Sequence, residues 1–335
     1  MKKLLLTVDT EGVRGIDPVR YQIWGDIGDG EHYGIPRIID ICDKYNIKAL
    51  FFVDIAEVWH FGDEKIKEVI DYIIKKGHDV GVHIHPHHMP NESRHFLYEF
   101  SRGEQYDIIK KCTDKFIEMV GTPPTSFRAG KYSANYDTLD ILDELGYKYD
   151  FSEFYSQKWC GIEPEIAYIL PQQYKGLVEF PVSIYKSLEI PMIYERYDKF
   201  EITSNFSELK YVLNKYLKTN NDEVLILFLH SFSFIDFLDT PDKPTFNERN
   251  EKNAILLLDF LSNSNDFEFL SETDLDKINI NAKDCESNIV LISNPFYALL
   301  YFYLRAWKII KTNRNAQILY TITFVLILLI IWIIF

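Results

Sequence analysis

Apolar and polar positions follow two alternating patterns through most of this 335-residue chain. Short, almost wholly apolar runs have the length of buried strands, and between them apolar residues recur at the spacing of amphipathic helices. Such alternation indicates βα units and a mostly parallel sheet or barrel, and Leu177–Ile193 is expected to form a local β insertion. The predicted strands are Leu4–Val8, Lys48–Val53, Asp79–Ile84, Ser126–Ala129, Tyr147–Phe151, Leu177–Val182, Val224–Leu229 and Phe267–Leu270, and the predicted helices are Ile35–Tyr45, Glu64–Lys76, Phe96–Val120, Tyr136–Leu145, Phe206–Leu217 and Glu251–Leu261.

A different pattern occupies the end of the chain. Residues 279–294 are expected to be a linker after a first domain of residues 1–278. Residues 295–315 carry apolar positions at helical spacing with basic residues between them, which predicts an amphipathic helix at a membrane interface. Residues 318–335 hold nothing more polar than tyrosine and threonine, and as a helix they would span about 27 Å, enough to cross a bilayer core. Because basic residues precede this span, we expect a C-terminal membrane anchor with the first domain on the cytoplasmic side.

Composition narrows the classes of function. The formal net charge is −14, and no acidic residue follows residue 288, so the first domain is strongly acidic. Nucleic-acid binding needs a basic face, and this class is therefore excluded. The four cysteines lie far apart in the sequence, which argues against a zinc knuckle or a disulfide scaffold.

Histidines are concentrated in one short segment. Six of the nine lie between His78 and His95, centred on Gly81-Val82-His83-Ile84-His85-Pro86-His87-His88. Imidazole is the commonest transition-metal ligand, so the segment predicts a metal site. Pro86 disfavours a helix here, and we expect the ligands to come from a strand end and the turn after it. His83 and His87, four residues apart, are the candidate metal ligands of the run. His85 and His88 are weaker candidates.

Polar residues also stand at the ends of other predicted strands, where parallel α/β folds carry their chemistry. Asp9 and Glu11 follow the first strand, and a period of two puts both on one face. Two carboxylates at a metal site can divide the work, one as a ligand and one as a general base. Two imidazoles and one carboxylate form a catalytic zinc set that leaves positions open for water and substrate. The other strand-end residues are Arg128, which can hold a carboxylate bidentately, Asp150, and His230, a candidate catalytic acid.

The order and spacing of these residues resemble the NodB-type polysaccharide deacetylases. Thr7-Val8-Asp9-Thr10-Glu11 is similar to the family's T-F-D-D motif, and Gly81 to His87 is similar to its G-x-H-S/T-x-x-H motif. Phe127 to Tyr132 resembles the R-x-P-Y motif, Tyr149 to Ser152 the fourth motif, and Leu227 to His230 the L-x-x-H motif. The resemblance implies a distorted (β/α) barrel of about seven strands and a divalent metal, with zinc as the first expectation.

The resemblance also assigns roles. It implies that Asp9 is the general base, that His83 and His87 bind metal, and that Arg128 pairs with Asp9. Asp150 would orient His230, the general acid.

Two departures from the family pattern change these assignments. Thr10 occupies the place of the family's metal-binding aspartate, so we expect Glu11 to be the carboxylate ligand. Tyr132 stands one residue later than in R-x-P-Y, so the oxyanion donor is expected to be the backbone N–H of Lys131 or Tyr132.

The leading hypothesis is a metal-dependent sugar deacylase held at the cytoplasmic face of a membrane, a location that would favour a lipid-linked saccharide. A second hypothesis turns the enzyme outward, toward cell-wall or surface polysaccharide. A third is a catalytically inactive sugar-binding or assembly module, motivated by Thr10. A phosphoesterase of H-x-H type is disfavoured, because only His230 remains after His95 to supply further ligands.

Overall fold

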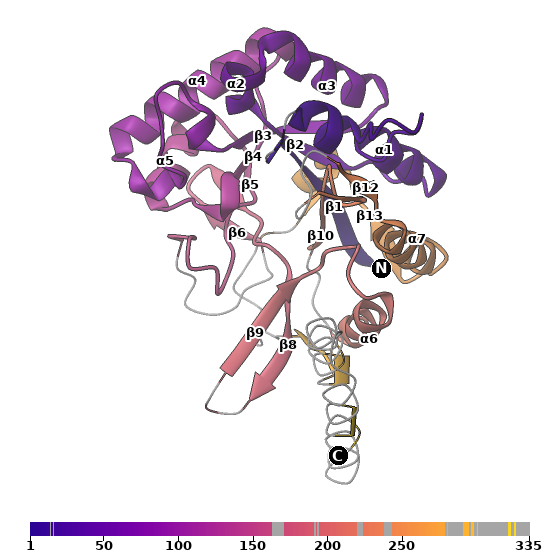
Figure 1. Ribbon diagram of the computed structural model, residues 1–335. Helices are drawn as coiled ribbons and strands as arrows, with labels where there is room; N and C mark the ends of the chain where they lie inside the picture. Colours follow the sequence, from indigo (N-terminus) through magenta and orange to yellow (C-terminus); the bar gives the residue numbers. More distant parts are fainter. Residues whose placement is uncertain are drawn as a thin grey trace.

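The computed structural model describes residues 1–13, 15, 17–162, 171–190, 192, 194–219, 224–237, 243–278, 280, 291–294, 296–297, 300, 321–322 and 325. A curled, mostly parallel sheet forms its centre, and helices form an arc around the outside of that sheet (Figure 1). The strands of the main sheet are β1 (Lys2–Thr10), β2 (Leu50–Asp54), β3 (Asp79–Ile84), β4 (Ser126–Ala129), β5 (Tyr149–Asp150), β6 (Gln172–Tyr174), β7 (Leu177–Glu179), β10 (Val224–His230) and β13 (Phe267–Phe269).

The predicted parallel barrel is confirmed in part. Strands run parallel along the path β10-β1-β2-β3-β4-β5-β7, while β6 pairs antiparallel with β7 and β13 pairs with the start of β1. In the part of the chain that the structure describes, no ladder joins β10 to β7 or β6. The sheet is therefore a curled half-barrel that stays open at one side.

The helices cover the outer face of this sheet. Their bounds agree with the predictions except where a polar residue caps the helix early. Phe96–Val120 was expected to be one helix, but Ser101 caps it, because its side chain and that of Glu104 bond each other's backbone N–H groups. The helices are α1 (Ile35–Lys44), α2 (Val58–Phe61), α3 (Asp63–Lys75), α4 (Arg102–Val120), α5 (Tyr136–Glu144), α6 (Phe206–Tyr216) and α7 (Glu248–Ser262), and the short ones are η1 (Val19–Trp24), η2 (Ile55–Glu57), η3 (Pro86–His88), η4 (Leu97–Glu99), η5 (Gly130–Tyr132) and η6 (Glu272–Lys277).

Strand alternation divides the core into two layers. In β1, Leu4, Leu6 and Val8 pack in the large cluster under the helices, whereas Leu5 packs in a second cluster inside the curl. Phe52 of β2 belongs to the same inner cluster. Because successive side chains of a strand point to opposite faces, residues that follow the inner positions toward the strand ends also face inward.

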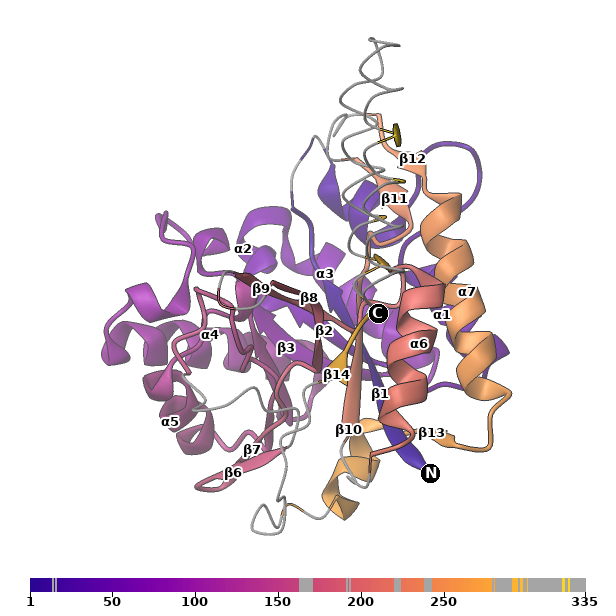
Figure 2. The same cartoon turned by 90° about the horizontal axis from the view of Figure 1, so that it is seen from below.

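The predicted β insertion is larger than expected. A hairpin of β8 (Ile184–Ile190) and β9 (Tyr194–Lys199) projects from the main body (Figure 1). β14 (Leu291–Ile292), which was expected to be linker, pairs parallel with β8. A view from below shows α6 and α7 side by side next to this ladder (Figure 2). A further small ladder joins β11 (Ile235–Asp236) to β12 (Thr245–Phe246).

The expected membrane anchor needs correction. No helix in the described ranges is long and apolar enough to cross a bilayer. Of residues 318–335, the structure describes 321–322 and 325, so most of the expected span lies outside the described residues, as does most of the amphipathic helix expected at 295–315. An apolar run shows hydrophobicity alone, whereas a membrane span also needs about 20 residues in one continuous helix. The prediction of a membrane-held, cytoplasmic domain, which depended on that run, is therefore wrong on this finding.

Candidate active site

Strand ends on the inner face of the sheet bring the predicted residues together. Asp9 of β1 lies in register with His230 of β10, and His83 of β3 lies in register with Arg128 of β4. Each follows an inner-layer position of its own strand, which is the face that strand alternation predicts. Residues that are distant in the sequence thus meet at one edge of the parallel sheet.

A buried ion pair joins the first and fourth strands of this edge. Arg128 Nη1 lies 2.6 Å from Asp9 Oδ1, and both side chains are almost fully buried. Arg128 also donates to Thr7 Oγ1 at 3.1 Å and to the Phe151 carbonyl at 3.3 Å, and its guanidinium lies 4.3 Å from the centre of the Phe52 ring. Burial raises the pKa of Asp9, but the charge of Arg128 and of nearby histidines outweighs it, so the pKa lies below its ordinary value. Asp9 is therefore held as a carboxylate.

Glu11 contacts two imidazoles beside that pair. Its Oε2 lies 2.5 Å from His85 Nε2 and 3.5 Å from His83 Nε2, and one ligand atom from each of the three residues lies within 4.8 Å of the others. Burial raises the pKa of Glu11, but the two histidines outweigh it and hold the pKa well below its usual range. Burial lowers the pKa of His83, but Asp9 and Glu11 outweigh it and raise the pKa to about 9.

The structure selects a different histidine partner from the one the sequence suggested. His83 lies where it was expected, but His85 and not His87 completes the three-residue group with Glu11. His87 lies behind, its ring 5.5 Å from that of His85 and 4.1 Å from that of His88. Burial and then the neighbouring histidines lower the pKa of His87 to about 3, and its Nδ1 is buried with no hydrogen-bond partner among the described residues. His87 is therefore neutral and within reach of this cluster.

His230 lies across β1 from the histidine segment. Its Nε2 is 3.8 Å from Glu11 Oε1, and its side chain is 25% exposed, against 2% for His83 and 8% for His85. Burial and the ammonium of Lys199 lower its pKa. In the described ranges, no hydrogen bond joins it to Asp150, which instead accepts from the Ser152 hydroxyl at 2.7 Å. The predicted contact between Asp150 and His230 is therefore not seen among the described residues.

The turn after β4 has unusual backbone geometry. Lys131 and Tyr132 have φ angles of 53° and 59°, in the left-handed region that residues with side chains rarely adopt. Two consecutive residues of this kind store strain, which is common at functional sites. Tyr132 is buried and Lys131 is exposed, so the turn presents one residue inward and one outward.

A second buried polar group adjoins the site, and sequence reasoning missed most of it. Asp54 Oδ2 lies 2.9 Å from His88 Nδ1, and Asp54 Oδ1 accepts from the backbone N–H of His85 at 3.2 Å. Glu57 bonds the backbone N–H of Gly12 through Oε1, while its Oε2 is buried without a partner. Asp54 closes the apolar run of β2, which is the signal that could have identified it. Its contacts hold the histidine segment in place from behind.

Comparison with known proteins finds a family likeness for part of the chain. Residues 25–149 match the family model described as polysaccharide deacetylase. This segment therefore resembles a polysaccharide deacetylase domain. Over 119 residues the chain is 27% identical to the peptidoglycan deacetylase of Helicobacter pylori, covering 36% of this chain and 36% of that protein. Over 168 residues it is 25% identical to a peptidoglycan deacetylase-like protein of Gibberella zeae, covering 45% and 43%. These matches thus span less than half of each curated relative.

Solved structures share the fold of this polysaccharide deacetylase domain. A Mycobacterium smegmatis protein that carries the name polysaccharide deacetylase matches with a TM-score of 0.54 at 17% identity, over 82% of this chain and 88% of that one. A Pseudomonas aeruginosa protein of the same name gives a TM-score of 0.51 at 12% identity, over 82% and 89%. Each likeness covers 82% of this chain, a larger share than residues 25–149.

The residues of this deacetylase domain fit a divalent metal. His83 Nδ1 lies 2.8 Å from the carbonyl oxygen of Arg128, so Nε2, on the side of Glu11, is the nitrogen that could bind a metal. Histidines that bind metals commonly make this contact through the other ring nitrogen. Two imidazoles and a carboxylate are a donor set that suits zinc and similar ions, and metal binding would displace the proton that the raised pKa of His83 retains.

Proposed function

We propose that this chain is a metal-dependent hydrolase that removes an N-acyl group, acetyl or formyl, from a carbohydrate. One observation carries the proposal: a carboxylate held by a buried arginine lies beside a carboxylate with two imidazoles, at the edge of a deacetylase sheet. The names of the curated relatives support a peptidoglycan-type substrate. A lipid-linked saccharide is the alternative substrate.

Glu11, His83 and His85 are the proposed metal-binding residues, with His87 as the alternative imidazole. The chemistry that a zinc-like ion supplies is a Lewis acid for the acyl carbonyl and activation of water. Thr10, which stands in place of the family's aspartate, motivated the hypothesis of an inactive sugar-binding module. The contacts of Glu11 with two imidazoles supply the carboxylate that Thr10 lacks, which favours the enzyme.

Asp9 is the proposed general base. Arg128 binds Oδ1 and keeps the group ionised, and Oδ2 is the oxygen that would take a proton from water. A base fixed by a buried arginine loses little orientational freedom when substrate binds. The proton would thus move to an atom whose position is set before the reaction begins.

His230 is the proposed acid that protonates the leaving nitrogen. It lies next to Asp9 across the β1–β10 ladder, and its side chain is more exposed than those of His83 and His85. A lowered pKa makes its protonated form a stronger acid, which suits donation to an amine. The left-handed turn at Lys131 and Tyr132 is the proposed source of a backbone N–H for the oxyanion.

Metal content and acyl release test this function. The full chain would be stripped with chelator, reloaded with zinc, and assayed for acetate or formate release from N-acetylglucosamine oligomers, peptidoglycan fragments and lipid-linked N-acyl sugars. We expect near-stoichiometric metal in the wild type and in Asp9→Asn, with activity about 10²- to 10⁴-fold lower in Asp9→Asn. Glu11→Ala should lose both metal and activity, while His32→Ala, a change at an exposed histidine outside the site, should lose neither. A wild type that takes up no metal, or a fully active Asp9→Asn, would contradict the proposal.

A further inference from the structure

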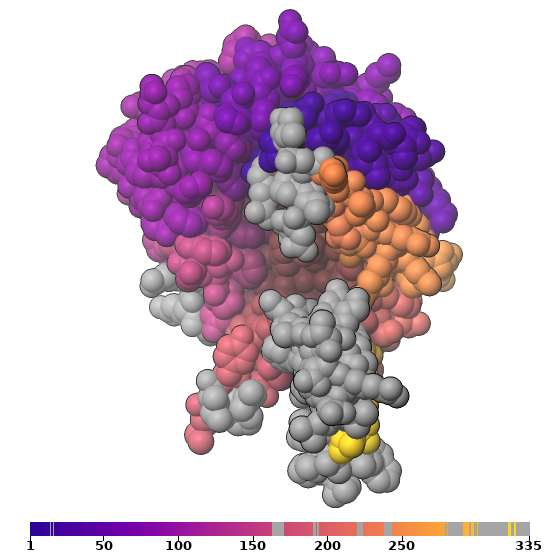
Figure 3. Space-filling view, in the orientation of Figure 1, coloured from indigo at the N-terminus to yellow at the C-terminus, as the bar shows by residue number. Residues whose placement is uncertain are grey.

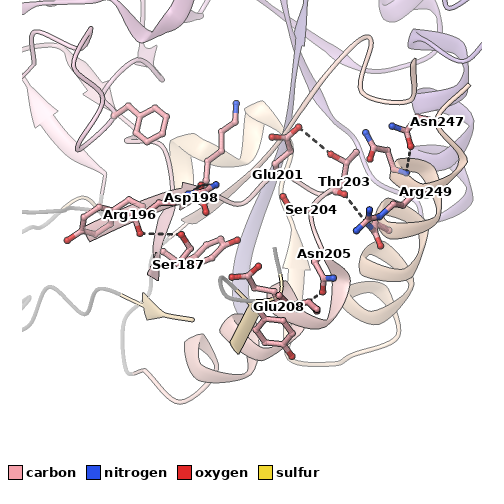
Figure 4. A pocket seen from close by; sticks show the side chains of 18 of the residues that line it. Ser187, Arg196, Asp198, Glu201, Thr203, Ser204, Asn205, Glu208, Asn247 and Arg249 are labelled. Atoms are coloured by element: carbon pink, nitrogen blue, oxygen red, sulfur yellow. Dashed lines mark hydrogen bonds and ion pairs between the residues drawn. The ribbon is translucent and has the colours of Figure 1, made fainter. Parts of the chain in front are cut away.

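A large cleft lies beside the candidate active site. It encloses about 1040 Å³ and is lined by the β8–β9 hairpin, the turn after β9 and the first turns of α6 and α7. Figure 3 shows this face hollowed between the orange surface around α7 and the magenta and pink surface opposite. In the close-up, Arg196, Asp198 and Ser187 stand on one side, and Asn247 and Arg249 stand on the other (Figure 4). Of the lining residues, Tyr132 alone lies within residues 25–149, so the cleft is built from parts that the family model does not match.

Lys199 connects the cleft to the active site. It is the last residue of β9, and the chain after it pairs with β10, where the Phe228 N–H donates to the carbonyl of Phe200 at 3.0 Å. Lys199 Nζ consequently lies 3.2 Å from the centre of the Phe228 ring and 3.4 Å from Tyr132 Oη. The Phe228 ring is in turn 4.7 Å from the ring of His230. A cationic nitrogen therefore lies in the wall of the cleft, and the Phe228 ring separates it from His230, the proposed acid.

The charge of Lys199 has no partner in the described part of the chain. Arg196 and Asp198 are already paired with each other at 2.9 Å, and Asp9 is paired with Arg128. Burial lowers the pKa of Lys199 to about 8, which still leaves it mostly charged at neutral pH. A half-buried cation without a counter-ion is unfavourable, so a fold that keeps one beside an open cleft favours an anion that arrives from outside.

Glu201 is the carboxylate of this protein that comes nearest to acting as the counter-ion of Lys199. It has the largest favourable electrostatic effect on Lys199, yet the two form no ion pair. Its Oε1 instead accepts a hydrogen bond from Thr203 Oγ1 at 3.3 Å. Among the described residues the ammonium donates to Tyr132 Oη alone, which leaves two of its three N–H groups for a ligand.

The rest of the cleft suits a saccharide. Rings of Tyr132, Phe154 and Tyr197 line one part, and side-chain amides of Asn247 and Asn250 line another. Ligand sites commonly combine apolar and aromatic walls with a few fixed polar groups. The single desolvated cation among them would select for charge.

We infer that Lys199 binds an anionic substituent, a carboxylate or a phosphate, on the sugar that the active site deacylates. The inference rests on the proposed function, and it makes Lys199 a residue that determines substrate specificity. The N–H groups left on the ammonium would donate to the anionic oxygens, and the cleft would hold the sugar that carries them.

Substrate selectivity of Lys199 variants tests this inference. Three N-acetyl substrates would be compared: a neutral glucosamine oligomer, an oligosaccharide containing a uronic acid, and N-acetylglucosamine 1-phosphate. In Lys199→Met, the ratio of KM for an anionic substrate to KM for the neutral one should rise about tenfold to hundredfold, while Lys199→Arg should stay within a few-fold of wild type. Whether the carboxylate or the phosphate substrate shows this dependence identifies the anion. Lys186→Met is the matched control, because Lys186 on the neighbouring strand pairs with Glu195 at 2.7 Å.

A binding measurement separates this inference from the proposed function. Calorimetric titration of metal-free protein with glucuronate and with N-acetylglucosamine 1-phosphate should show binding that Lys199→Met weakens by the same factor. If no substrate is deacylated but this binding depends on Lys199, the proposed function fails and the anion site stands. If neither anion binds the wild type, or if Lys199→Met raises KM equally for neutral and anionic substrates, the inference is overturned.

Discussion

The ion pair between Asp9 and Arg128 should be among the most stabilising polar contacts of the protein. Both side chains are almost fully buried, so solvent screens the pair only weakly. Truncating one member of such a pair leaves the other charge buried and unpaired. We predict that Asp9→Asn and Arg128→Gln each lower the free energy of unfolding substantially, and that the two effects are not additive.

The magnitude follows from the contacts of each group. Removing one partner of a buried ion pair costs about 3–5 kcal/mol. Arg128→Gln also loses the hydrogen bonds to Thr7 and to the Phe151 carbonyl, at about 1 kcal/mol each. In the double variant neither charge remains, so its cost should fall short of the summed single costs by about 2–3 kcal/mol.

The assay is urea unfolding of the metal-free proteins at pH 7, followed by circular dichroism. The same cycle at lower pH provides an internal check on Asp9. Its folded pKa lies below its unfolded value of 3.8, so its contribution to stability is present above that value and is lost as pH falls through the folded pKa. Asp9→Asn should lack this loss.

Additive costs would refute the reasoning. If the double variant loses the sum of the single changes within about 0.5 kcal/mol, the two side chains are energetically independent. Should Arg128→Gln fail to fold, Arg128→Met replaces it in the cycle, because it also removes the charge and keeps an unbranched apolar stem.

Three further predictions concern neighbouring groups. Zinc at a hundred times its dissociation constant should stabilise the wild type by about 2.7 kcal/mol in thermal unfolding. His85→Ala should abolish more of this gain than His87→Ala, and the reverse order would mean that His87 is the metal ligand. Lys199→Met should raise stability at pH 7 by up to about 3 kcal/mol, because burial lowers the folded pKa of Lys199 to about 8 from 10.5. This gain should vanish as pH rises from 8 to 10.5, and a gain independent of pH would contradict a desolvated ammonium. Glu57→Gln should cost less than about 1 kcal/mol in urea unfolding, since burial and the charge of Asp54 raise the pKa of Glu57 well above its ordinary value and favour the protonated form. Asp54→Asn should cost about 1–3 kcal/mol, and equal costs would mean that both carboxyl groups are ionised.

The sequence predicted which strands carry the site, and strand periodicity explains why. A period of two placed Asp9 and Glu11 on one face, and the structure has Asp9 near the end of β1 and His83 near the end of β3, with β2 between them. The same period also places His85 with His83, because the chain stays extended through His85 before Pro86 starts η3. The prediction chose His87 from its motif spacing of four, and it overlooked that the strand conformation continues to His85.

Lateral order and long-range pairing were beyond the sequence pattern. Asp150 was expected to orient His230, but nothing local indicates that its carboxylate accepts a hydrogen bond from the Ser152 hydroxyl instead. Lys199 was not predicted at all, since its position depends on pairing of the chain after β9 with a strand nearly 30 residues later. Such placements come from tertiary contacts, which a single sequence does not reveal.

The pairing of β14 with β8 bears on how the chain can be shortened. Leu291 and Ile292 lie against Tyr185 and Lys186, and the Ser293 N–H donates to the carbonyl of Lys186 at 2.9 Å. A chain cut after Ile278 would keep every proposed catalytic residue and yet leave one side of β8 as a bare strand edge. Exposed edges recruit strands from other molecules. Such a truncated protein should therefore self-associate through the hairpin that carries Lys199. Because this hairpin lines the cleft, self-association would disturb the proposed substrate site.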